Sequence, residues 1–184
     1  MTLLDLQVLE IAGDTLFRER AIEALDRYWQ ERRLGVLEKE KDWPVSRNQI
    51  STIRQIARQQ PHEMAAFAAH QQKRAEAKNY NNRYDDEIAF WKLLAGVCKP
   101  RGADPSWALE QYAEETAPPE LADPFAGQTK SQLSTEQRQQ RSAVKKNRDR
   151  WLDVWRRHAY PLFFQHFTAH YLYVATRTKK AATV

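Results

Sequence analysis

The spacing of apolar residues constrains this fold most, because they recur every three or four positions rather than at every second one. Phe17, Ala21, Ala24 and Tyr28 follow one another at intervals of four, three and four. Such spacing places side chains on one face of an α-helix. The 184 residues include only five glycines. We therefore expect an all-α fold, a single-domain bundle of about five to seven helices over residues 1–184.

The clearest helix start lies between Trp43 and Ile50. Ser46 occupies the expected N-cap position and Gln49 follows three residues later, which is the spacing of a capping box. Val45 and Ile50 are placed to form the hydrophobic staple beside it. Because the residue before a proline is disfavoured in helices, this helix should end before Pro61.

The remaining helices are expected on both sides of this one. A first helix should start after Thr2 and break at residues 13–14, and Asp14 should cap the second. A loop or insertion is expected at residues 116–133, which hold three prolines. Further helices are expected at 62–78, from a cap at Asp85 or Asp86 to about residue 98, and from Asp104 to Tyr112. A long helix should start at a second capping box, Ser134 with Gln137, and run to about Tyr160. After a kink or restart at Pro161, the last helix should continue to about residue 180.

The net charge of +5 is distributed unevenly along the chain. Residues 45–83 carry +5 and residues 128–184 carry +9, whereas residues 102–127 hold six acidic side chains and no basic one. Two basic segments separated by an acidic one are typical of a protein with one side facing a polyanion. The acidic segment is then available to basic neighbours.

Three arginines share one flank of the helix that follows Ser46. Arg47, Arg54 and Arg58 are spaced seven and four apart, so they fall within about 40° of each other around the helix axis. No carboxylate occurs between Asp42 and Glu63, although solvated helix faces usually carry both signs of charge. An anion is therefore the expected partner of this flank.

We expect the basic helices to contact backbone phosphates, because lysine and arginine neutralise phosphates without reading base sequence. Most tryptophans and tyrosines stand at inward helical positions, which favours core packing over base stacking. The predicted nucleic-acid-binding residues are Arg47, Arg54, Arg58, Lys73, Arg74, Arg138, Arg141, Lys145 and Arg148.

Local motifs of catalysis and metal binding are not found in the sequence. His166 and His170 have the spacing of two ligands on one helical turn, but no further ligand or general base accompanies them. Cys98 follows an apolar residue near a helix end, which is typical of a small buried side chain. Asp85 and Asp86 are explained as helix caps. We expect no enzymatic activity, no metal and no cofactor.

Membrane insertion and secretion are also not expected. No apolar run approaches the roughly 20 residues that span a bilayer. The single Cys98 excludes an intramolecular disulfide, and the first residues include Asp5 and Glu10 without a basic leader. These features predict a cytoplasmic protein.

Two segments, VSRNQISTIRQIARQ at 45–59 and FFQHFTAHYLYVATR at 163–177, resemble the small all-helical subunit of type III CRISPR effector complexes. In that family an early helix opens with Ser or Thr and a Gln-Ile-Arg-like step, and the last helix carries aromatics near a basic residue. Here Ser51 stands where the pattern has arginine, and Ile53 and Arg54 restore the step one turn later. The acidic segment at 102–133 is longer than a compact member would have.

The resemblance implies a non-catalytic subunit of a ribonucleoprotein complex in antiviral defence. Such a subunit holds guide and target RNA strands by their backbones and contacts neighbouring protein subunits. In this sequence the matching basic helix carries Arg47, Arg54 and Arg58.

Two other functions stay open on the sequence alone. A helical adaptor could present the same basic faces to acidic proteins, because a guanidinium pairs with carboxylate and phosphate alike. An enzyme whose site is assembled from distant carboxylates and histidines would leave no local motif. The leading expectation is a module that binds RNA or another nucleic acid.

Overall fold

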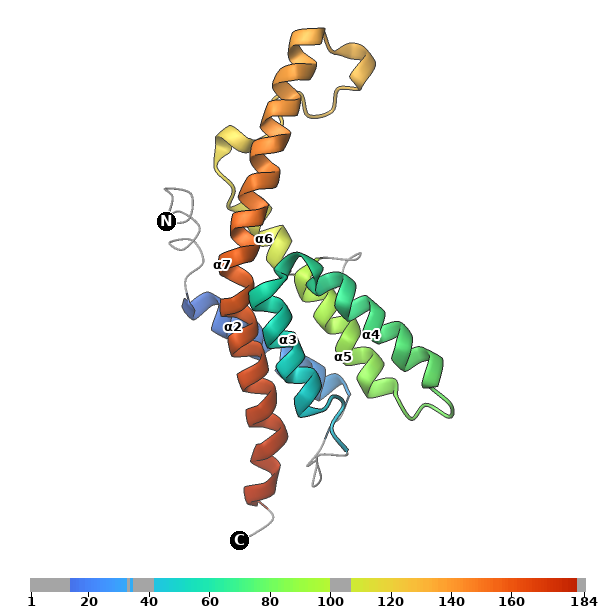
Figure 1. Ribbon diagram of the computed structural model, residues 1–184. Helices are drawn as coiled ribbons and strands as arrows, with labels where there is room; N and C mark the ends of the chain where they lie inside the picture. Colours follow the sequence, from blue (N-terminus) through green and yellow to red (C-terminus); the bar gives the residue numbers. More distant parts are fainter. Residues whose placement is uncertain (1–13, 33, 35–41, 100–106, 182–184) are drawn as a thin grey trace.

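Six α-helices and no strands form the part of the chain that the computed structural model describes, residues 14–32, 34, 42–99 and 107–181 (Figure 1). This confirms the expected all-α class. None of the described helices is apolar over enough residues to cross a bilayer. The α-helices are α2 (Asp14–Glu31), α3 (Arg47–Gln59), α4 (Met64–Lys78), α5 (Asp85–Cys98), α6 (Leu109–Glu115) and α7 (Thr135–Ala181).

Helix α7 runs the length of the molecule, and α2 and α3 pack against its carboxyl-terminal half (Figure 1). Beside them α4 and α5 form an antiparallel hairpin that leans away from α7. Of the two outcomes predicted at Pro161, a kink or a restart, the restart is wrong, because Pro161 lies inside the single 47-residue helix α7. Proline removes one bond of the helix ladder. Its neighbours Tyr160, Phe163 and Phe164 are buried, however, and tertiary packing of such a face supplies most helix stability.

The core is aromatic and lies between α2, α5 and α7. The buried ring of Phe90 on α5 lies 5.9 Å from Tyr28 of α2, and 5.9 Å and 5.3 Å from Phe167 and Tyr171 of α7. Such edge and tilted contacts add to the burial of apolar area. The prediction that most tryptophans serve the core is confirmed, since the buried ones are Trp29, Trp43, Trp91, Trp151 and Trp155.

Helix α3 begins with the predicted capping box. The Gln49 N–H donates to the Ser46 hydroxyl (3.3 Å), and the Ser46 N–H donates to the Gln49 side-chain oxygen (2.7 Å). Val45 and Ile50 are both buried, as expected of the staple. The Tyr171 hydroxyl of α7 donates to the Val45 carbonyl (2.9 Å) and accepts from the Val45 N–H (3.1 Å). The start of α3 is therefore fixed to α7.

The predicted caps of α5 are wrong. Tyr84 occupies the N-cap position, and Asp85 and Asp86 both lie in the first turn instead. Asp85 instead accepts a hydrogen bond from the Asn79 amide (2.8 Å), and Asp86 pairs with Arg32 near the end of α2 (2.7 Å). The two carboxylates therefore connect α5 to the residues that follow α4 and α2, and do not cap the start of α5.

Several predicted boundaries cannot be compared with the structure. The helix after Thr2, the break at residues 13–14 and the start near Asp104 lie outside the described residues, as does the side chain of Asp14. The described part of the short helix, α6, includes Tyr112.

Residues 116–150 form an arm that projects beyond the other helices (Figure 1). Residues 116–133, where a loop or insertion was expected, lie between α6 and α7 and contain two single-turn 3₁₀ helices, Pro119–Leu121 and Lys130–Gln132. The second predicted capping box is confirmed where the loop enters α7, because Ser134 and Gln137 exchange hydrogen bonds of 2.8 and 3.2 Å. The loop packs along α7 and reinforces the arm.

Candidate nucleic-acid interface

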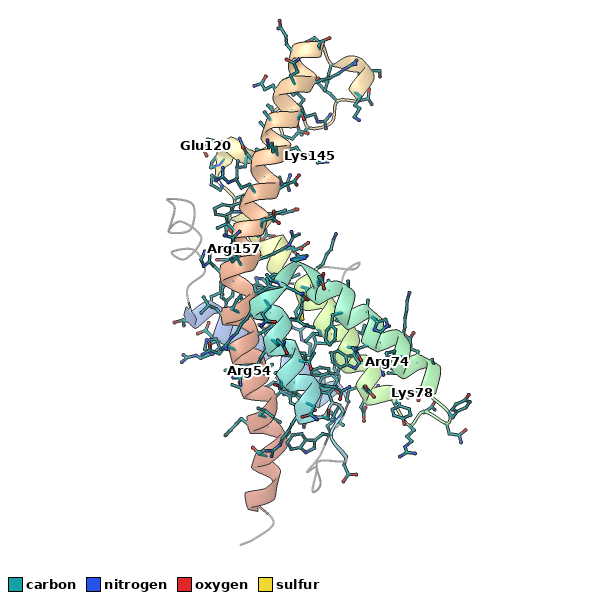
Figure 2. All side chains as sticks on the ribbon, in the orientation of Figure 1. Arg54, Arg74, Lys78, Glu120, Lys145 and Arg157 are labelled. Atoms are coloured by element: carbon teal, nitrogen blue, oxygen red, sulfur yellow. The ribbon has the colours of Figure 1, made fainter. Side chains whose placement is uncertain are left out.

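The three arginines of α3 lie along its seam with α7. Figure 2 labels Arg54 at this seam. Burial of the apolar arc of α3 turns the neighbouring arginine flank toward α7. The Nε of Arg54 is buried and has no hydrogen-bond partner in the described part of the chain. Arg58 borders the seam beside Pro161. The guanidinium of Arg47 lies over the Trp43 ring, 5.4 Å from its centroid.

A groove of about 400 Å³ lies between α3 and α7 beside these arginines, and we call it the α3–α7 groove. It combines cations, hydroxyl groups and an exposed aromatic ring, the groups by which proteins contact phosphates and bases. Its polar and aromatic lining consists of Arg47, Ser51 and Arg54 on α3, and Tyr173 and Thr176 on α7.

A second group of cations lies near the carboxyl end of α4. Arg74 and Lys78 border a groove of about 320 Å³ between α3, α4 and α5. Glu87 also borders this groove, but its carboxylate accepts hydrogen bonds from the Gln49 amide (3.0 Å) and the Trp91 indole (3.2 Å). These two bonds tie Glu87 to α3 and the core rather than to either cation.

Two of the predicted arm residues hold the loop against α7. The Arg141 guanidinium binds Asp123 at 2.7 and 2.8 Å and donates to the Gln128 carbonyl at 2.9 Å. The Nε of Arg138 donates to the Leu133 carbonyl at 3.0 Å. The structure therefore gives both arginines a local role in closing the arm.

The acidic segment meets arginines of its own chain. Arg148 pairs with Glu114 at 3.1 Å, and Arg156 makes two hydrogen bonds of 2.6 and 2.9 Å to Glu110. The pair with Arg148 offsets the position of Glu114 near the carboxyl end of α6, which the helix dipole disfavours, whereas Glu110 lies in the first turn, where the dipole favours an anion. Two of the glutamates in this segment therefore already have arginine partners within the chain.

Replacing Arg141 by glutamine should loosen the arm without unfolding the rest of the molecule. The variant leaves Asp123 without its guanidinium partner, and a lost charged hydrogen bond costs about 1.5–3 kcal/mol. We expect amide hydrogen exchange in residues 116–134 to accelerate roughly tenfold or more. Lys145→Gln is the matched control, because Lys145 is exposed and forms no ion pair with the described residues. Equal exchange in both variants would contradict the role of Arg141.

The nine predicted residues occupy three separate places rather than one surface. Figure 2 shows Arg54 at the seam, Arg74 on the α4–α5 hairpin and Lys145 on the arm. Of the nine, those that form no hydrogen bond or ion pair with the described residues are Arg54, Arg58, Lys73, Arg74 and Lys145.

Several further cations of the described part of the chain, Arg18 and Lys92 among them, have the same property and were not predicted. Lys78 borders the α4 groove, and Lys146, Arg150 and Arg157 are exposed on α7. The last three are spaced four and seven apart, so they share one face of the helix. This spacing could have been used to predict the three cations from the sequence, because the arginines of α3 have the same two intervals in the reverse order.

His170 of the histidine pair forms a contact between helices, and Cys98 is buried in the core. His170 Nε2 lies 2.8 Å from Asp26 Oδ1 and so links α7 to α2. Within the described ranges, no three metal-ligating side chains come together. The predicted burial of Cys98 is confirmed, and burial raises the pKa of its thiol far above the ordinary value.

Comparisons of the chain with models of protein families, with characterised proteins and with solved structures gave no match. The resemblance to CRISPR small subunits therefore rests on the two helical segments alone. What the chain binds has to be inferred from its own charges and contacts.

Proposed function

We propose that this chain is a non-catalytic subunit of a ribonucleoprotein complex that binds nucleic-acid backbone through the cations of α3, α4 and the arm. The observation that supports the proposal most is the contrast between its paired and unpaired cations. On α2, Arg20 and Arg27 both pair with Glu23, at 2.8 and 3.3 Å. On α3, Arg54 and Arg58 have no such carboxylate among the described residues.

Unpaired cations gathered beside grooves favour a polyanion over a solvated surface. A phosphate backbone supplies repeated acceptors to arginine and lysine, and each contact releases a counterion. If four or five cations each neutralise one phosphate of a single strand, log affinity should fall against log salt with a slope of roughly −3. In the CRISPR resemblance, the bound strands would be guide and target RNA and the protein partners would be neighbouring subunits.

The first test is the binding of a labelled 30-nucleotide single-stranded RNA across a salt series. The double variant Arg54→Glu, Arg58→Glu should lose tenfold or more in affinity and flatten the salt slope by at least about 1.4, because two phosphate contacts disappear. Arg18→Glu with Lys92→Glu makes the same charge change at exposed positions on α2 and α5 and should bind nearly as the wild type does. Far-ultraviolet circular dichroism confirms that helicity is kept.

Two results would contradict the proposal. One is an RNA-binding curve that the α3 double variant leaves unchanged. The other is the absence of binding by the wild type even at low salt. In either case the basic faces would be assigned to acidic protein partners, the function of a helical adaptor.

A further inference from the structure

We infer that Tyr173 stacks on an unpaired base in the α3–α7 groove, so that this groove selects single-stranded over duplex nucleic acid. The inference rests on the proposed function, since it needs a strand held by the cations of α3. It goes beyond backbone binding because it assigns a base contact and a strand type to one place on the surface.

Tyr173 is exposed in a molecule whose other large rings are mostly buried. Among the described residues, two large hydrophobic side chains are exposed, Tyr80 at 81% and Tyr173 at 54%. Tyr80 lies in the turn between α4 and α5, whereas Tyr173 borders the α3–α7 groove together with Arg54. An exposed ring beside a cation is the arrangement that single-strand-binding proteins use as a stacking platform.

The ring of Tyr173 is held in place before any ligand arrives. The His170 ring stacks beside it, with centroids 6.0 Å apart and planes inclined by 29°. His170 is in turn fixed by Asp26 of α2, 2.8 Å away. A side chain that is already ordered loses less entropy on binding. The platform is therefore tied to the core although Tyr173 as a residue remains exposed.

The opposite wall of the groove supplies the phosphate contact. Arg54 lines this wall, and its buried Nε lacks an acceptor among the described residues. Since Arg54 forms no ion pair with the described residues, its guanidinium can form charge-assisted hydrogen bonds to a phosphate that enters the groove. A phosphate at Arg54 with its base on Tyr173 uses both walls at once. The Ser51 hydroxyl on the same wall can serve the sugar or phosphate.

Strand type follows from the accessibility of the base. In a duplex each base face is already covered by its neighbours in the stack, and exposing one costs several kilocalories per mole. In a single strand the bases are free to unstack, and stacking on an aromatic side chain favours the complex for any base. Duplexes should therefore reach the cations but not the ring.

The experiment compares three labelled probes with the full-length chain: a 30-nucleotide oligouridine, a ribose-phosphate strand of equal length without bases, and a 30-base-pair RNA duplex. The wild type should bind oligouridine roughly tenfold more tightly than the baseless strand, in line with the contribution of one stacked base. Tyr173→Ala should lose about that factor on oligouridine and nothing on the baseless strand. Tyr173→Phe should bind as the wild type does.

Tyr80→Ala is the matched control, since it removes the other exposed tyrosine and should change no affinity. The inference is overturned if Tyr173→Ala binds oligouridine as tightly as the wild type, or if the wild type does not distinguish oligouridine from the baseless strand or the duplex. If Arg54→Glu with Arg58→Glu still weakens binding in that case, backbone binding stands and only the base contact fails. If the wild type binds none of the three probes, both proposals fail.

Discussion

Raising the pH above about 10 should unfold the protein cooperatively, because four buried acids stay protonated in the folded state. Burial raises the pKa of the Tyr28, Tyr160 and Tyr171 hydroxyls and of the Cys98 thiol well above their ordinary values. Those values are roughly 10 for tyrosine and 8.5 for cysteine. Above them the unfolded chain releases protons that the folded chain retains, so the free energy of unfolding falls as pH rises.

The expected loss is large enough to exceed the stability of a small domain. Each fully retained proton costs about 1.4 kcal/mol per pH unit, so the four groups together remove on the order of 7 kcal/mol by pH 11. Typical domains are stable by about 5–15 kcal/mol. The measurement is far-ultraviolet circular dichroism between pH 8 and 12, with tyrosinate absorbance followed in parallel. Ionisation of all seven tyrosines near pH 10 with unchanged helicity would contradict the assignment, because it would include the three buried ones.

Replacing Phe90 by alanine should destabilise the fold by about 3–5 kcal/mol, the range for deleting a buried aromatic side chain. Phe90 is fully buried, and its ring joins α5 to Tyr28 of α2 and to Phe167 and Tyr171 of α7. Its loss leaves a cavity where three helices meet. Urea unfolding gives the free energy, with Phe125→Ala in the arm as the control, because Phe125 lies outside the core. Equal losses for both variants would refute the central role of Phe90.

The elements that the sequence predicted correctly depend on short windows of residues. The capping boxes at Ser46 and Ser134 each involve partners three residues apart, so local chemistry determines them. The mistaken boundaries depend on distant contacts. Asp86 is held by Arg32, 54 residues away, and α7 passes Pro161 because its flanks are buried against other helices.

The same distinction applies to the candidate interface. Helical spacing placed the arginines of α3 on one flank, and the structure keeps them together at the seam with α7. Spacing could not reveal that Arg141 is occupied by Asp123, 18 residues earlier. Tyr173 was not among the predicted residues, and it lies two positions after the buried Tyr171. Two positions along a helix correspond to about 200°, so the exposed direction of Tyr173 was already implied.

The position of α7 in the chain affects how the protein is made. Contacts that close the core join residues far apart in sequence, as between Val45 and Tyr171 or between Asp26 and His170. On the ribosome, α2, α3 and α5 emerge with their apolar faces uncovered, and the helix that covers them is synthesised last of the six. Folding of the body therefore waits until residues near Ala175 are available. Until then the nascent chain exposes aromatic surface, which favours aggregation.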